Sequence, residues 1–162
     1  MGKIAEEIRQ ARPFKTLEAE AMVTLLRTAD VIRTQLEAAL KPWGLSGEQY
    51  NVLRILRGAP DHAHPTLEVA SRMISRAPNI TRLIDKLIGK GLVFRRSSED
   101  DRRVVEVRLT PKGLRVVIES TPVLEALDAR LLRCLSAPRL KALIRGLDEV
   151  RASALRNSRE AP

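Results

Sequence analysis

The sequence predicts a mainly α-helical protein with one small β-hairpin, and three observations support this fold class. Apolar residues recur at intervals of three and four through most of the chain, which is typical of amphipathic helices. Two short segments, residues 92–95 and 104–109, are instead β-branched or alternating, which is typical of strands. The chain has 162 residues, of which 44% are hydrophobic, so it can form one compact core with terminal extensions.

The formal net charge is +9, and most of the excess lies in one stretch. Residues 72–115 contain twelve basic and five acidic side chains, a net charge of +7. This favours binding to nucleic acid, although a solvated basic face that aids solubility explains a charge run equally well. No apolar run approaches the ~18–20 residues that cross a bilayer, and no secretion signal is present, so we expect neither membrane insertion nor export. The single cysteine, Cys134, suits a cytoplasmic protein.

Two helices are expected before the basic stretch. An apolar stripe predicts a long helix over residues 17–40, which Pro42 ends. A second helix should span residues 47–57, because Ser46 followed three residues later by Gln49 is typical of a capping box.

Two further helices follow in close succession. Thr66 is expected to cap a short helix, and Ser75 to cap a longer one over residues 76–90 that ends at Gly91. The longer helix has an apolar face formed by Ile80, Leu83, Ile84, Leu87 and Ile88. Its position after a short helix and a tight connection is typical of a helix-turn-helix.

The strand segments should pair as a hairpin around a charged loop, residues 96–103, that projects into solvent. Thr110-Pro111 then opens another helix, whose stripe continues past Pro122. A last helix begins near Ser136 or Pro138, and residues 157–162 are expected to fray.

A helix-turn-helix followed by such a hairpin forms a winged helix-turn-helix, whose second helix fits the major groove of B-DNA. With its apolar face buried, this helix must turn Asn79, Arg82 and Lys86 outward together. Arg76 and Thr81 lie near its leading end, where the helix dipole favours a phosphate. The loop with Arg102 and Arg103 would lie beside this helix, where an arginine can enter the minor groove.

Residues 45–113 resemble the MarR family of bacterial transcriptional regulators. The resemblance lies in three stretches in the family's order: GLSGEQYNVLRIL, NITRLIDKLIGKGLV and DDRRVVEVRLTPKG. It implies that Asp101 and Arg103 are the wing pair, with Arg103 in the minor groove and Asp101 holding it. It also implies major-groove contacts from Arg82 and its neighbours, and a homodimer on a pseudo-palindromic operator. Members are often released from DNA by a small aromatic or anionic ligand, or by cysteine oxidation.

The expected domains follow from this arrangement. They are an N-terminal extension (1–16), an N-terminal dimerisation helix (17–44), the winged helix-turn-helix lobe (45–113), C-terminal dimerisation helices (114–156) and a frayed tail (157–162). The terminal helices are long and apolar-striped but lie outside the small winged core, so their stripes need a partner.

Several residues allow two interpretations. Arg95 and Arg96 are candidate contacts to the DNA backbone or solvated strand residues. Trp43 and Tyr50 are candidate lining residues of a ligand pocket, or packing residues. His62 and His64 would need further ligands to bind a metal, so an ordinary polar loop is favoured and no metal is expected. Cys134 is expected to be a small buried hydrophobe, because it lies on or near the stripe of Leu127, Leu131 and Leu135. The peroxide-sensing members of the family have their cysteine near the N-terminus, which argues against a redox sensor here.

We therefore expect a cytoplasmic, homodimeric, sequence-specific DNA-binding regulator, more often a repressor, without catalytic residues or a cofactor. The chain lacks a phosphate-binding loop and any supported Ser/His/Asp or Cys/His arrangement, which argues against an enzyme. RNA binding is disfavoured because the major groove of A-form RNA is too narrow for a helix. The alternative is a non-specific or architectural DNA-binding protein without a ligand.

Overall fold

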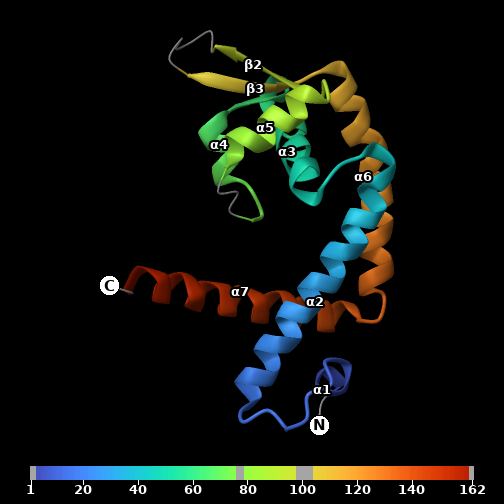
Figure 1. Cartoon of the computed structure of the whole chain (residues 1–162), viewed down its shortest axis with the longest axis vertical. Helices are drawn as coiled ribbons and strands as arrows, with labels where there is room; N and C mark the ends of the chain where they lie inside the picture. Colours follow the sequence, from blue (N-terminus) through green and yellow to red (C-terminus); the bar gives the residue numbers. More distant parts are fainter. Residues whose placement is uncertain (1–2, 76–78, 98–103, 161–162) are drawn as a thin grey trace. The chain divides into compact units, whose positions relative to one another are not determined.

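The computed structural model describes residues 3–75, 79–97 and 104–160, and the chain divides into two compact units, residues 1–124 and 125–162. It is mostly helical with a small antiparallel sheet, which confirms the predicted fold class (Figure 1). The helices are α1 (Lys3–Glu7), α2 (Leu17–Leu40), α3 (Gly47–Arg57), α4 (Thr66–Ser71), α5 (Ile80–Gly89), α6 (Pro111–Leu132) and α7 (Ala137–Glu160). Two 3-10 turns, η1 (Lys41–Trp43) and η2 (Pro60–His62), and three strands, β1 (Ala63–Pro65), β2 (Val93–Ser97) and β3 (Val105–Leu109), complete the described elements.

The first two predicted helices are present at the predicted bounds. The side chain of Ser46 accepts a hydrogen bond from the amide of Gln49 at 3.2 Å, and the side chain of Gln49 accepts one from the amide of Ser46 at 3.3 Å. This is the predicted capping box of α3. Gly44, at φ 61°, makes the left-handed turn after η1 that leads into it.

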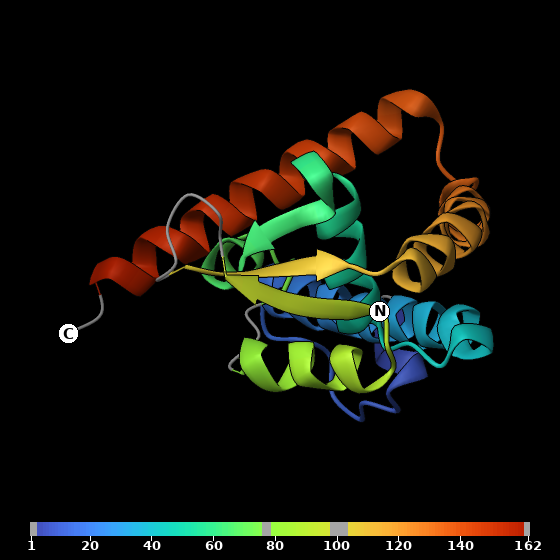
Figure 2. The ribbon, with the colours of Figure 1, turned by 90° about the horizontal axis from the view of Figure 1, so that it is seen from above.

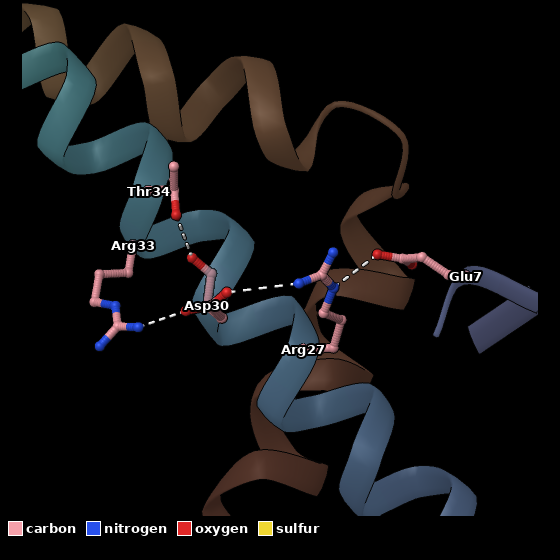
Figure 3. A network of polar contacts seen from close by, with 5 residues as sticks. All are labelled: Glu7, Arg27, Asp30, Arg33 and Thr34. Carbon is pink, nitrogen blue, oxygen red and sulfur yellow. Dashed lines mark hydrogen bonds and ion pairs between the residues drawn. The ribbon is translucent and has the colours of Figure 1, made fainter. Parts of the chain in front are cut away.

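The segment expected only as an N-terminal extension contains α1, which packs against α2. Ile4 and Ala5 are buried, and Arg27 of α2 donates to Glu7 at 2.8 Å. Asp30 extends this network to Arg33 and also lies 3.7 Å from Arg27 (Figure 3). The hydrogen bond and charge of Glu7 raise the pKa of Arg27 above its already high ordinary value.

The sheet has three strands in the order β1-β3-β2, one more than the predicted hairpin. Ala63 pairs with Arg108, and Val93 pairs with Leu109 on the other side of β3. The sequence before α4 was expected to be an irregular polar stretch, because three residues ending in a proline give no strand periodicity. Only pairing with β3 makes them a strand.

Two of the predicted helix caps are wrong. Thr66 is the first residue of α4, not its cap, and its hydroxyl donates to the carbonyl of Val105 in β3 at 3.3 Å. The cap of α5 is Asn79, whose Oδ1 accepts from the amide of Arg82 at 3.0 Å, so α5 begins four residues later than a Ser75 cap implies. Asparagine is as good a cap as serine, so composition alone did not separate the two positions.

The core of the lobe lies between α3, α5 and the sheet. The apolar face of α5 is directed inward as predicted: Leu83, Ile84 and Leu87 are buried, and Ile80 and Ile88 are partly buried. These side chains join a set of buried residues from the other elements of the lobe: Val52, Leu53, Leu56, Val69, Val93, Val107 and Leu109. This packing leaves the opposite face of α5 in solvent.

The beginning of α6 is fixed as predicted by Thr110, whose hydroxyl accepts from the amide of Gly113 at 2.9 Å. The helix continues through Pro122. In the second unit, α7 extends to Glu160. That residues 157–162 fray stays a prediction. Cys134 is exposed rather than buried, and it lies beyond the end of α6.

Candidate nucleic-acid interface

The exposed face of α5 is the centre of the candidate interface. Thr81, Arg82 and Lys86 are all exposed, and they lie opposite the buried Leu83, Ile84 and Leu87. Asp85 is the one acidic side chain of this helix and is exposed among them. The face therefore presents two cations, a hydroxyl and one carboxylate.

Asn79, predicted to face outward with Arg82 and Lys86, uses its side-chain oxygen inside the chain. That oxygen accepts the amide hydrogen of Arg82 and fills the position before the first turn of α5. The amide nitrogen of Asn79 and the second lone pair of its oxygen are the groups that a contact to DNA could use.

Arg95 is likewise engaged within the chain. Its Nη1 donates to Oδ1 of Asp85 at 2.6 Å, and its Nη2 donates to the carbonyl of Thr81 at 3.4 Å. The two elements that these bonds join, β2 and α5, run side by side (Figure 2). Arg96 is the next residue along β2, so strand alternation directs its side chain to the other face of the sheet, where it is exposed.

Two further contacts hold the helix-turn-helix in place. Nζ of Lys90, at the end of α5, donates to Oε1 of Gln49 at 2.8 Å and to the carbonyl of Gly44. The buried Asn51 accepts the amide hydrogen of Ile74 at 2.9 Å, which fixes the chain just after α4. The sequence predicted neither the contact of Lys90 nor that of Asn51. Both depend on how separate elements pack, which helical periodicity does not reveal.

Four of the predicted DNA-binding residues, Arg76, Asp101, Arg102 and Arg103, lie outside the described residues. Their assignments stay predictions. β2 ends at Ser97 and its antiparallel partner β3 begins at Val105, as the two strands of a wing require.

The candidate ligand-pocket residues lie on neighbouring elements. Trp43 is half-buried at the end of η1, and Tyr50 is buried in α3. The hydroxyl of Tyr50 lies 3.3 Å from Oγ1 of Thr121 in α6, to which Arg57 also donates at 2.9 Å. The sequence did not predict a role for Thr121, because its contacts with Tyr50 and Arg57 depend on how α6 packs against α3.

The histidine pair gives no sign of a metal site. Nδ1 of His62 lies 3.1 Å from the carbonyl of Arg57, and His64 lies in β1 opposite Val107. Among the residues that the structure describes, no group of three His, Cys, Asp or Glu side chains is placed to hold a metal ion. In the same residues, no helix combines the length and apolar character needed to span a membrane.

Comparison with known proteins decides the family. The model of the MarR family matches residues 45–105. The HTH-type transcriptional repressor Rv2887 of Mycobacterium tuberculosis is 30% identical over 126 residues, which cover 78% of this chain and 89% of the repressor. The chain belongs to the MarR family. A MarR transcription factor from Planctomyces limnophilus is 39% identical and superposes with a TM-score of 0.63, covering 84% of this chain and 98% of that one.

More distant MarR structures share the fold. AbsC, a MarR family regulator from Streptomyces coelicolor, superposes with a TM-score of 0.78 at 24% identity and covers 91% of this chain and 99% of its own. The organohalide-sensing regulator RdhR-CbdbA1625, solved with bound 2,4-dichlorophenol, has a TM-score of 0.77 at 16% identity, covering 90% of this chain and 88% of its own. MarR proteins are DNA-binding transcriptional regulators and not enzymes, and this chain is one of them.

Proposed function

We propose that this MarR protein is a cytoplasmic homodimeric repressor that binds a pseudo-palindromic operator in double-stranded DNA and occludes the promoter. The observation that carries the proposal is the exposed face of α5, where Arg82 and Lys86 project from a helix whose other face is buried in the lobe. An α-helix of this kind fits the major groove, whose base edges it can contact directly.

In this proposal Arg82 contacts a base edge, and Thr81 and Lys86 contact bases or nearby phosphates. Arg82 is exposed and in the first turn of α5, and the first turn is the part of a recognition helix that reaches the base edges. Arginine can donate two hydrogen bonds to O6 and N7 of guanine, the commonest base-specific contact. Arg76 would bind a phosphate at the leading end of the helix.

The wing would bind the adjacent minor groove. Arg103 is proposed to enter the groove with Asp101 holding its guanidinium, and Arg102 to bind beside it. Arg96, exposed on β2, is proposed as a contact to the DNA backbone.

The proposal of a homodimer is supported by apolar side chains that this chain leaves in solvent. On α7 they are Leu143, Ile144, Leu147, Val150 and Leu155, and on α2 they include Met22, Leu25, Leu26 and Ile32. Apolar stripes of this extent are typical of interfaces between subunits. A two-fold dimer would place its two α5 helices about 34–36 Å apart, one turn of DNA.

A small aromatic or anionic ligand is proposed to release the repressor from DNA. Support comes from Trp43 and Tyr50, and from Arg57 and Thr121, which add a cation and a hydroxyl beside the phenol of Tyr50. The test is titration of 2,4-dichlorophenol and salicylate into the protein–operator complex. If Tyr50→Phe changes the ligand concentration that releases the protein from DNA, the ligand binds at this site. If that concentration is the same in Tyr50→Phe and in the wild type, the ligand binds elsewhere.

The function is tested by selecting bound fragments from the genomic DNA of the source organism at about 0.15 M salt, which gives the operator and its half-site spacing together. On that operator, Arg82→Ala should cost about 1–3 kcal/mol of binding free energy and relax the preference at one base position in each half-site. The control is Arg54→Ala, which removes an exposed arginine from α3 and should leave the base preference intact.

Equal weakening on all sequences would reduce Arg82 to a phosphate contact. If the wild-type protein also enriched no common sequence, the alternative of a non-specific architectural DNA-binding protein would replace the proposal.

A further inference from the structure

The exposed face of α5 contains a carboxylate in an unfavourable place. Asp85 lies beside the row formed by Arg82 and Lys86 on the helix that we propose to enter the major groove, where the phosphates repel a negative charge. Its side chain is 53% exposed, so burial does not explain its presence.

The partner of this carboxylate is Arg95 of β2. Strand alternation places Arg95 on the same face of β2 as the buried Val93, which is the face toward α5. From there its guanidinium bonds Asp85 at 2.6 Å and reaches the carbonyl of Thr81 at 3.4 Å. Thr81 and Asp85 are one helical turn apart, so Arg95 spans one turn along the edge of the exposed face. Its bond to Thr81 uses the backbone carbonyl, and the side chains of Thr81, Arg82 and Lys86 stay exposed.

On its other side, α5 contacts the core of the lobe through apolar side chains. Leu83, Ile84 and Leu87 pack against the core by apolar contact, which is non-directional, and the directional bond from Lys90 to Gln49 lies at the end of α5. A rotation of about 20° moves a side chain at the helix surface by about 2 Å, whereas a hydrogen bond to a base tolerates only a few tenths of an ångström. A directional contact at the side of the helix therefore affects base recognition more than stability.

We propose that the Asp85–Arg95 pair sets the rotation of α5 against β2 and so aims Arg82 and Lys86 at the DNA. Arg95 is then a positioning residue for the recognition helix instead of a contact to the DNA backbone. The inference rests on the proposed function, since it assigns these residues a part in operator recognition.

The proposal and a purely electrostatic account predict opposite signs for one variant. If Asp85 only repels phosphates, Asp85→Asn strengthens binding to every DNA. If Asp85 positions α5, Asp85→Asn weakens binding to the operator and leaves binding to unrelated DNA unchanged or slightly stronger.

The experiment compares Asp85→Asn, Arg95→Gln and the double variant on the operator and on unrelated duplex DNA. We expect each single variant to lose about tenfold in operator affinity, within the range that one mismatched contact costs, and to change non-specific affinity by less than about twofold. The double variant should lose no more than either single one, because the two residues act as one pair. A phosphate contact would instead lower the salt dependence of binding by about one unit in Arg95→Gln, and that result would overturn the proposal.

Glu68→Gln is the matched control. Glu68 pairs with Arg72 at 2.7 Å with similar exposure, and its replacement changes the net charge equally, but both partners lie on or next to α4 and join no second element. It should leave the ratio of operator to non-specific affinity unchanged.

A measurement without DNA separates failure of this inference from failure of the proposed function. Amide hydrogen exchange in residues 80–89 should be faster in Asp85→Asn and Arg95→Gln than in the wild type, and unchanged in Glu68→Gln. Unchanged exchange in all three variants would overturn the inference whether or not an operator exists. Faster exchange together with a wild-type protein that binds no DNA would overturn the proposed function alone.

Discussion

Gly113 lies where the start of α6 passes the backbone of the segment that enters β2. A Cβ atom at this position would lie 2.0 Å from the carbonyl oxygen of Leu92, far inside van der Waals contact. That carbonyl also accepts the amide hydrogen of Thr110 at 3.0 Å, so it has little freedom to move aside. The absence of a side chain at Gly113 is what allows α6 to begin against the sheet.

Gly113→Ala should therefore lower the free energy of unfolding by about 3 kcal/mol, the upper part of the range for overpacking a tight site. The measurement is urea unfolding followed by circular dichroism. Gly89→Ala is the control, because a Cβ atom there meets nothing within 4 Å and alanine favours a helix. A Gly113→Ala protein as stable as the wild type would mean that α6 can shift at no cost.

At the scale of the element, α5 depends on its first turn. Asn79 supplies the hydrogen-bond acceptor for the amide of Arg82, and that amide has no carbonyl partner within the helix. The same residue was predicted to face DNA, so stability and recognition need to be separated at this position.

The substitution Asn79→Ser keeps a capping oxygen and removes the amide group, so it tests the part that residue 79 plays in stability. Asn79→Ser should change the free energy of unfolding by less than about 0.5 kcal/mol, whereas Asn79→Ala should lose about 1 kcal/mol. Thermal unfolding of both variants checks this. Equal losses in the two would show that the amide group of Asn79, not its capping oxygen, stabilises the first turn.

The elements differ in how well the sequence predicts them, and the reason is physical. α3 and the apolar face of α5 were predictable because capping and periodicity are local properties of the chain. β1 was not, since its three residues become a strand only by pairing with β3, which is more than forty residues away. The start of α5 was misplaced because Ser75 and Asn79 are both good caps, and only tertiary packing selects one.

The candidate site shows the same division. The exposure of Thr81, Arg82 and Lys86 follows from helical geometry once the apolar face is known. The pairing of Asp85 with Arg95 does not, because it depends on the angle at which α5 packs against β2.

At the scale of the whole molecule, the apolar stripe of α7 leads to a prediction about assembly. In a helix each residue is rotated by about 100° from the last, which places Leu147 near the middle of the stripe from Leu143 to Leu155 and Ala152 on the opposite side. A charge introduced at Leu147 would be buried on dimerisation, whereas a charge introduced at Ala152 would stay in solvent.

Leu147→Glu should therefore convert the dimer to a monomer at micromolar concentration and weaken operator binding, while Ala152→Glu should change neither. Sedimentation equilibrium measures the mass of each variant. A wild-type protein that is monomeric at tens of micromolar, or a Leu147→Glu protein that stays dimeric, would exclude this face of α7 as the interface.

The short outer strand of the sheet also affects how the protein behaves when concentrated. β1 contributes only three residues, and the last is Pro65, which has no amide hydrogen to donate. An extended segment from another molecule would find too few free backbone groups along this edge to pair with, so the edge is a poor template for strand-to-strand aggregation. Purified preparations should resist fibril growth from this side of the lobe even at the high concentrations that crystallisation requires.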